Sequence, residues 1–524
     1  MKGIGRYFFM AYGDIPFVYG LMQEPPLSGL SGGTGIGSSF DPNALIESGI
    51  VEVQGEPLSL TGRGVLIGFV DTGIRYELDV FRHSDGTTRI ASIWDQEADR
   101  IYTEETINNA LRSENPRSIV ATTDDLGHGT AMASVAAGSR VDGGRSYLGA
   151  APDSRLLVVK LKQAPRDVRE YYLVPDDAVC YSETEIDQGL RFLDEQAERL
   201  GLPLVICFGL GTNLASHTGT STLERTINSI AVKIGRAVVI CSGNEGNKQH
   251  HFQGCFNRNA LQDAVGNLRR DVEIRVSEGV QGFTMNVWGT QPYQYQFSLR
   301  SPGGETVRDI RMNMDGTATH RFVYERTTLY IDAQRVETGS GAQLLFLRFV
   351  SPTPGIWTLT VTEGERANYA LFHAWLPIDA FLTAPVTFLE PSPYITLTDP
   401  AAAWEAVGVS TYDDLNNSFY PESGRGYTRD GRVKPDVAAP GVSVSTAIGK
   451  RTGSSIAAAV TAGAVAQFLQ WAVTEQHLPW INSINVKNYL VRGAVRDLDI
   501  VYPSREWGYG RLSISGVFES MAEL

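Results

Sequence analysis

Cysteine is scarce in this chain: four of its 524 residues are Cys, at positions 180, 207, 241 and 255. No two of them are spaced like the ligands of a zinc or redox motif. Cys207 and Cys241 lie in or beside apolar runs, where a free thiol packs like a small hydrophobic side chain. We therefore predict buried free thiols, and neither a disulfide framework nor a metal centre built on cysteine.

Long hydrophobic runs are also lacking. No stretch reaches the ~18 apolar residues that a membrane span needs. The N-terminus, MKGIGRYFFM, has neither a long apolar core nor a small-residue cleavage site. The sequence thus predicts no membrane span and gives no support for secretion by a signal peptide. It favours cytoplasmic synthesis and leaves later release open.

Basic residues are fewer than acidic ones. The 45 Lys and Arg against 59 Asp and Glu give a net charge of −14. Because phosphate binding needs a basic face, this balance argues against nucleic acid as a main partner.

Histidine is sparse as well, with eight residues in the chain. The adjacent His250 and His251 are interpreted as a solvated loop pair, since neighbouring side chains point apart. No Asp-rich loop of the calcium-binding kind is recognisable. We expect no cofactor, no metal site and no requirement for bound calcium.

The regular pattern that is present begins near residue 65. Short, almost continuous apolar runs alternate with amphipathic helical periods, as in strands that helices cover on both faces. The runs occupy 65–70, 156–159, 204–208 and 237–240, and the helical periods 185–200 and 223–235. This pattern predicts a doubly wound α/β domain with a parallel sheet.

Between about 266 and 385 the period changes to two, as at Val272, Ile274 and Val276. Several such runs separated by Gly and Pro indicate half-buried antiparallel strands and an all-β sandwich. The α/β pattern resumes at 402–410. The predicted organisation therefore has three parts. Residues 1–55 form an N-terminal segment, a prodomain remnant or flexible arm. Residues 56–262 and 389–524 form the α/β domain, and residues 263–388 form the inserted β-sandwich.

Three polar residues lie at positions where functional groups are common, at the end of a predicted strand or the start of a predicted helix. Asp71 follows an apolar strand, and functional groups gather at the carboxyl ends of parallel strands. His128 lies between two glycines at a predicted helix start, and Ser455 begins an Ala-rich helix whose first amides are free to bind negative charge. Each residue alone also has a structural explanation, a turn Asp, a core His or a helix cap.

Taken together, these motifs resemble those of the subtilase family. Asp71-Thr72-Gly73, Gly127-His128-Gly129-Thr130 and Gly453-Ser454-Ser455-Ile456-Ala457 occur in the order Asp, His, Ser that subtilisin uses. Lys434-Pro435-Asp436-Val437 and Gly149-Ala150-Ala151-Pro152 resemble two further family segments. The resemblance covers roughly 60–262 and 395–515. It implies a serine endopeptidase with Asp71, His128 and Ser455 as catalytic triad.

The resemblance also implies the remaining site residues. Asn244, in a segment similar to the family's A-x-G-N-x-G, is expected to donate its side-chain N–H to the oxyanion. Gly209, Leu210 and Gly211 correspond to the strand that pairs with an extended substrate. The opposite wall of the specificity pocket is expected from three consecutive residues: Cys241, Ser242 and Gly243. The partner implied is a protein or peptide in extended form.

The insert and the serine helix are most similar to the Csp-type germination proteases of clostridia, which carry a jelly-roll insert. This resemblance implies a spore-associated protein that activates a precursor during germination. Two alternatives stay open: a catalytically silent regulator on the same fold, and a carrier whose sandwich binds carbohydrate or protein. A rigidifying clamp is the simpler interpretation of the sandwich.

Overall fold

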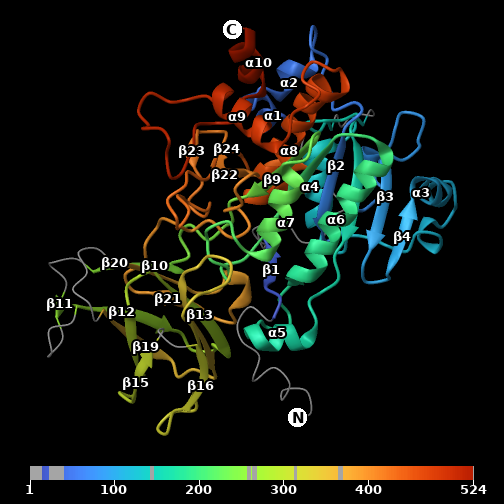
Figure 1. The fold of residues 1–524 in the computed structure, drawn as a ribbon. Coiled ribbons are helices and arrows are strands. Elements are labelled where there is room, and N and C mark those ends of the chain that lie inside the picture. Colours follow the sequence, from blue (N-terminus) through green and yellow to red (C-terminus); the bar gives the residue numbers. More distant parts are fainter. Residues whose placement is uncertain are drawn as a thin grey trace.

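The computed structural model describes residues 15–22, 40–141, 147–256, 261–262, 268–311, 315–363 and 370–522. Its main body is a twisted sheet between two layers of helices, and two further sheets form a separate lobe beside it (Figure 1). The predicted fold class, a subtilisin-like α/β arrangement with an inserted β domain, is confirmed. The division of the chain into domains at particular residues stays our proposal.

The central sheet has the order β23-β22-β9-β7-β2-β5-β3-β4, and β24 also pairs with β22. Its inner pairs are parallel, and the outermost pairs on each side are antiparallel. The strands are β2 Leu66–Asp71, β3 Ile90–Asp95, β4 Arg100–Thr103, β5 Arg155–Lys160, β7 Leu204–Phe208, β9 Arg236–Cys241, β22 Val407–Asp413, β23 Ser418–Phe419 and β24 Val437–Pro440. The four strands predicted from apolar runs are confirmed within one or two residues at each end.

Hydrophobic clusters on the two faces of this sheet use alternate residues of one strand. Ile67 and Phe69 of β2 belong to one cluster, and Leu66 and Val70 to another. The first cluster includes residues of α4 His128–Ala137 and α8 Ser454–Leu469, and the second those of α6 Glu183–Leu200 and α7 Thr222–Ala231. Helix α7 ends at Ala231, before the predicted residue 235, and Gly235, with its left-handed φ of +69°, lies in the turn that leads into β9.

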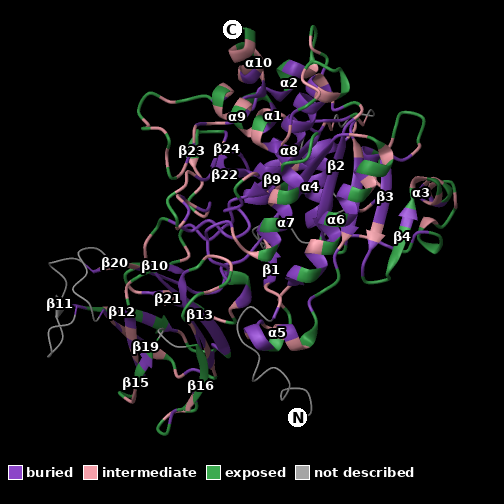
Figure 2. Ribbon diagram, in the orientation of Figure 1, coloured by how far each residue is buried: buried purple, intermediate pink, exposed green. Residues whose placement is uncertain are grey.

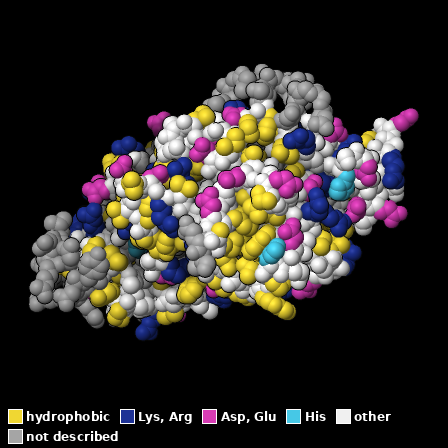
Figure 3. Space-filling view, turned by 90° about the horizontal axis from the view of Figure 1, so that it is seen from above, with side chains coloured by type: hydrophobic (Ala, Val, Ile, Leu, Met, Phe, Trp, Pro, Cys, Tyr) yellow, Lys and Arg dark blue, Asp and Glu magenta, His cyan; other side chains and the backbone are white. Residues whose placement is uncertain are grey.

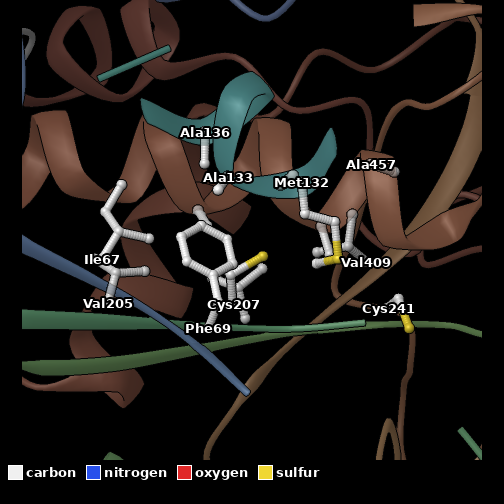
Figure 4. Packing of buried hydrophobic residues seen from close by; sticks show 14 of the residues in the cluster. Ile67, Phe69, Met132, Ala133, Ala136, Val205, Cys207, Cys241, Val409 and Ala457 are labelled. Carbon is white, nitrogen blue, oxygen red and sulfur yellow. The ribbon is translucent and has the colours of Figure 1, made fainter. Parts of the chain in front are cut away.

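Helix α8 is buried along its whole length (Figure 2), and it packs against β7, β9 and β22 and against the neighbouring helix α4. Figure 4 shows Met132, Ala133 and Ala136 of α4 packed between α8 and side chains of the sheet such as Phe69 and Cys207. The continuous helix Ser454–Thr474 is long and apolar enough to span a membrane. However, 89% of the apolar window lies inside the protein, as expected for a core helix.

The remaining helices lie at the edges of the α/β body. Four of them pack against one another at the top of Figure 1: α1 Asn43–Glu47, α2 Ile50–Gln54, α9 Ser483–Gly493 and α10 Ile514–Ala522. Seen from this end, acidic and basic side chains are interspersed with hydrophobic ones (Figure 3). The other two are α3 Glu104–Leu111, beside β3 and β4, and α5 Arg166–Tyr172, close to the N-terminal strand.

The second lobe is a pair of antiparallel sheets that share one hydrophobic core. The first has the order β10-β20-β13-β18-β17-β16 and the second β11-β12-β19-β14-β15, with β21 paired to β12. Their bounds are β10 His251–Phe256, β11 Leu261–Gln262, β12 Leu268–Val276, β13 Gly282–Gly289, β14 Tyr295–Arg300, β15 Thr306–Arg311, β16 Gly316–Arg321, β17 Thr328–Gln334, β18 Gln343–Val350, β19 Gly355–Glu363, β20 Ala370–Trp375 and β21 Val386–Phe388. Val272, Ile274 and Val276 face this core, as their alternation predicted.

The prediction of a solvated histidine pair is wrong, because His250 and His251 are 3% and 1% exposed. Their side chains do point apart. His250 Nδ1 lies 2.7 Å from a Glu245 carboxylate oxygen, and His251 Nε2 lies 3.1 Å from His373 Nδ1. Both rings are buried where the sandwich meets the α/β body. The local sequence does not reveal this contact between the two parts of the molecule.

The N-terminal segment contributes one strand to the described structure, β1 Val18–Leu21. It lies between β6 Tyr181–Ser182 and β8 Leu210–Gly211 and is antiparallel to both. In Figure 1 it is found at the junction of the sandwich and the α/β body. The Gly- and Ser-rich run at 28–39, part of the N-terminal segment predicted to be a prodomain remnant or flexible arm, lies outside the described residues.

Candidate active site

Asp71 and His128 are brought together by the end of β2 and the start of α4. His128 Nδ1 lies 2.7 Å from Asp71 Oδ1, and both side chains are 1% exposed. The approach depends on small residues: a methyl group on Gly129 would overlap the carbonyl oxygen of Gly73. A buried carboxylate bound to Nδ1 fixes the ring and stabilises its protonated form, so this pair can accept a proton at Nε2.

The start of α4 is held by Asp124, which sequence reasoning did not single out. Its carboxylate accepts hydrogen bonds from the Thr72 hydroxyl at 2.8 Å, the Gly127 N–H at 2.7 Å and both the N–H and the hydroxyl of Thr130. The residue is 1% exposed. Asp124 thus joins the loop after Asp71 to the helix that carries His128, and it is a positioning residue.

Ser455 lies in the first turn of α8, after Gly453, whose φ of +150° favours glycine. Its side chain is fully buried. Within the described part of the chain, neither Ser455 Oγ nor His128 Nε2 has a hydrogen-bond partner. Buried polar atoms are normally paired, so these two unpaired atoms, on helices that pack together, are candidates for a reactive pair.

Asn244 follows β9 and reaches the same helix start. Its Oδ1 accepts a hydrogen bond from the Ser454 N–H at 3.0 Å, and the residue is 8% exposed. This bond fixes the side-chain amide beside the backbone of Ser455. Four predicted site residues therefore meet where the ends of β2 and β9 face the starts of α4 and α8.

The strand β1 brings the chain's own backbone to this centre. Met22, directly after β1, donates its N–H to the Gly209 carbonyl at 3.1 Å. Its own carbonyl accepts a hydrogen bond from the Ser455 N–H at 3.3 Å. Gly20 and Leu21 pair with Gly211 and Leu210. The predicted substrate strand thus holds an extended segment whose Met22 carbonyl is bound to the amide of Ser455.

The Met22 side chain enters a pocket between the two predicted walls. Its Sδ lies 3.9 Å from the Thr398 hydroxyl, and a methyl group on Gly211 would come within 3.1 Å of the sulfur. Gly243 faces Thr398 from the other wall, and the Thr398 N–H donates to the Ser242 carbonyl at 3.0 Å. Glycines at 211 and 243 leave the space that the methionine and Thr398 fill.

Cys241, expected in the same wall, is a buried free thiol, as are Cys180 and Cys207, while Cys255 is free and half-buried. Burial raises the pKa of Cys241 to about 12, so its thiol stays protonated at neutral pH. Its Sγ lies 4.0 Å from the Leu210 carbonyl oxygen. The free-thiol prediction is confirmed, and Cys241 acts as a small apolar wall residue.

Besides Asp124, sequence reasoning missed two features of this site. Thr398 lies far along the chain, after the sandwich, in a segment without a recognisable motif. The occupying strand left a weak signal, the apolar run Phe17–Met22 ahead of a Gly-rich stretch. No group of three or more His, Cys, Asp or Glu side chains suited to a metal ion occurs among the residues that the structure describes.

Comparison with known proteins is consistent with this geometry. The model of the subtilase family matches residues 62–303 and 393–510. The structure of the CspB protease of Clostridium perfringens matches with a TM-score of 0.82 and 27% sequence identity, over 92% of this chain and 100% of that chain. The prenylagaramide maturation protease PagA matches with a TM-score of 0.43 and 13% identity, over 90% of this chain and 98% of that chain. Sphericase matches with a TM-score of 0.43 and 15% identity, over 89% of this chain and 97% of that chain. With more than half of its length matched by the family model, the chain belongs to the subtilase family and is a serine endopeptidase.

Proposed function

We propose that this protein hydrolyses peptide bonds with Ser455 as nucleophile, His128 as general base and Asp71 as the carboxylate that orients the histidine. The observation that carries the proposal is the hydrogen bond from the Ser455 N–H to the Met22 carbonyl. It places a peptide carbonyl of an extended strand at the start of α8, beside the serine whose hydroxyl is unpaired among the described residues.

The chemistry follows from these atoms. As Ser455 Oγ attacks the substrate carbonyl carbon, His128 Nε2 takes the hydroxyl proton and Asp71 stabilises the imidazolium through Nδ1. The same proton then passes to the leaving amine, and an ester remains on Ser455. Water, activated by His128, releases the carboxylic acid and restores the serine.

Two hydrogen-bond donors stabilise the negative charge that develops on the substrate's carbonyl oxygen. The Ser455 N–H already binds such an oxygen, and the Asn244 side chain is held beside it by its bond to the Ser454 N–H. A helix start also favours negative charge. Asn244 and the Ser455 amide together form the proposed oxyanion hole.

The preferred substrate is an extended peptide that enters between β6 and β8, as β1 does. The pocket that Met22 occupies suits an unbranched apolar side chain before the cleaved bond. Because the chain's own segment fills this cleft, we propose that residues up to Met22 act as an inhibitory segment, the prodomain remnant expected from the sequence. The bond after Met22 is the one presented for self-cleavage.

The test is reaction of the purified chain with a fluorophosphonate, which labels only activated serines, followed by mass spectrometry. Met22→Asp is included because a buried charge against Thr398 is unfavourable and should free the cleft. We expect label on Ser455 in this variant and none after Ser455→Ala. Ser454→Ala is the matched control, a neighbouring buried serine whose loss should leave labelling intact.

Failure to label folded Met22→Asp protein would contradict the proposed nucleophile and favour the silent regulator. Label on a residue other than Ser455 would contradict the proposed nucleophile as well. The precursor-activating role in germination and the spore location rest on the resemblance to CspB-type proteases. Cleavage of a candidate spore precursor by the wild type, but not by Ser455→Ala, is the corresponding experiment.

A further inference from the structure

The segment that joins β20 to β21 of the sandwich, called here the covering segment, lies over the strand in the cleft. This segment contains the short helix η3 Asp379–Phe381, which contacts β1. The contact falls on Gly20, which is buried. A methyl group on Gly20 would lie 2.6 Å from Ile378 Cδ1 and 3.4 Å from Phe381 Cε1. A carbon atom at 2.6 Å is well inside van der Waals contact, so a side chain at this position requires the buried Ile378 side chain to shift.

The requirement for glycine at position 20 comes from the space around it and not from its backbone conformation. The φ of Gly20 lies outside the left-handed region, so other residues could adopt the same backbone. Gly20 pairs with Gly211 on β8, which keeps its backbone fixed in register. A larger residue at this position can fit only if the Ile378 side chain or the covering segment moves.

Several contacts hold the covering segment in place. Ile378 and Phe381 are 1% and 3% exposed. The Asp379 N–H donates to Glu245 Oε1 at 3.1 Å, and the other carboxylate oxygen of Glu245 lies 2.7 Å from His250 Nδ1. Glu245 directly follows Asn244 in the chain. The covering segment is thus hydrogen-bonded to the loop that contains Asn244, the proposed oxyanion donor.

We propose that Ile378 and Phe381 form a closed subsite that selects glycine as the third residue before the cleaved bond. The bound segment satisfies this rule with Gly20, and with Met22 as the first residue before the bond. The inference rests on the proposed function, because it assumes that substrates bind as β1 does. The sandwich then has a role in specificity through the connection between its strands β20 and β21.

Hydrogen exchange of the segment Phe17–Met22 tests the subsite without requiring catalysis. It is measured in the full chain with Ser455→Ala, to prevent self-cleavage. We expect Gly20→Ala to lower the protection of this segment at least tenfold. Ile378→Val, which removes only Cδ1, should restore protection in the double variant and leave it unchanged alone. Full protection of Gly20→Ala, or no recovery with Ile378→Val, would overturn the proposal.

Peptide cleavage tests selection in trans. The Met22→Asp protein is given Phe-Val-Tyr-Gly-Leu-Met-Gln-Glu and the same peptide with Ala for Gly. We expect kcat/KM to be about tenfold lower for the alanine peptide, and the two values to converge in the Ile378→Val background. Equal values with Ile378 present would overturn the selection. Loss of all cleavage, with the exchange pattern as expected, would refute the proposed catalytic function and leave the glycine subsite supported.

Discussion

At the scale of single residues, the site depends on how closely two backbones approach. Gly129 follows His128, and a methyl group there would overlap the Gly73 carbonyl oxygen and lie 3.2 Å from Asp71 Oδ1. Gly129→Ala should therefore displace His128 from Asp71. Because a misplacement of ~1 Å can cost about 10²-fold, we expect kcat to fall by about that factor.

The measurement is kcat on a peptide substrate, with Gly316→Ala as control. That position has open space for a methyl group, so its kcat should match the wild type. A Gly129→Ala enzyme with unchanged kcat would show that His128 is not held by this contact.

Asn244 can be tested at the same scale, because its two side-chain functions separate. Asn244→Asp keeps an oxygen that can accept from the Ser454 N–H but removes the amide donor, whereas Asn244→Ala removes both. We expect both variants to lose about 10²–10³ in kcat, with little change in KM. Near wild-type kcat in Asn244→Asp would limit Asn244 to holding α8.

At the scale of elements, the packing of α8 on α4 decides where Ser455 and His128 lie. Gly463 of α8 has the side chain of Ala150 and the carbonyl oxygen of Ala136 against it, too close for an added methyl group. Gly463→Ala should force the helices apart and lower the free energy of unfolding by about 1–3 kcal/mol. Chemical denaturation measures this loss.

A displaced α8 should also reduce activity, since the nucleophile moves with the helix. If Gly463→Ala were as stable and as active as the wild type, the close approach of the two helices would not be required. The strand β1 in the cleft depends on packing in a similar way, because a four-residue strand has little stability of its own and is held by β6 and β8.

At the scale of the whole molecule, a cluster of buried rings joins the sandwich to the α/β body. Trp375 stacks on His217, with ring centroids 4.1 Å apart, and on His251 at 4.5 Å. Burial lowers the pKa of both His217 and His251 to about 3, and that of His373 well below its usual value. Burial also raises the pKa of the nearby carboxyls of Asp399 and Glu224.

The signs of these shifts predict opposing effects of pH on stability. An unfolded histidine takes up a proton below about pH 6.5 and the folded one does not, so stability falls as the pH falls from 6.5. The loss is about 1.5 kcal/mol per histidine between pH 6.5 and 5. The raised pKa of the carboxyls acts oppositely, because their stabilisation is lost as the pH rises above about 4.

A variant separates the two contributions. In His251→Gln, the free energy of unfolding should fall less between pH 6.5 and 5 than in the wild type, by about 1.5 kcal/mol. Denaturant unfolding at four pH values in this range measures the difference. An identical pH dependence in both proteins would contradict a neutral, buried His251.

The sequence by itself determined the α/β fold, the antiparallel insert and the candidate residues Asp71, His128, Asn244 and Ser455. Each of these lies in a local motif at the end of a strand or the start of a helix, where backbone geometry restricts which residue types fit. The parallel strands also follow from local pattern, because burial on both faces leaves a continuous apolar run.

Only the tertiary structure decided what surrounds these residues. Thr398 in the pocket, Ile378 above Gly20 and the buried pair His250 and His251 depend on segments brought together from distant parts of the chain. Whether a polar side chain is buried depends on such partners and not on its neighbours in sequence. For the same reason, the place of β1 in the cleft did not follow from its short apolar run alone.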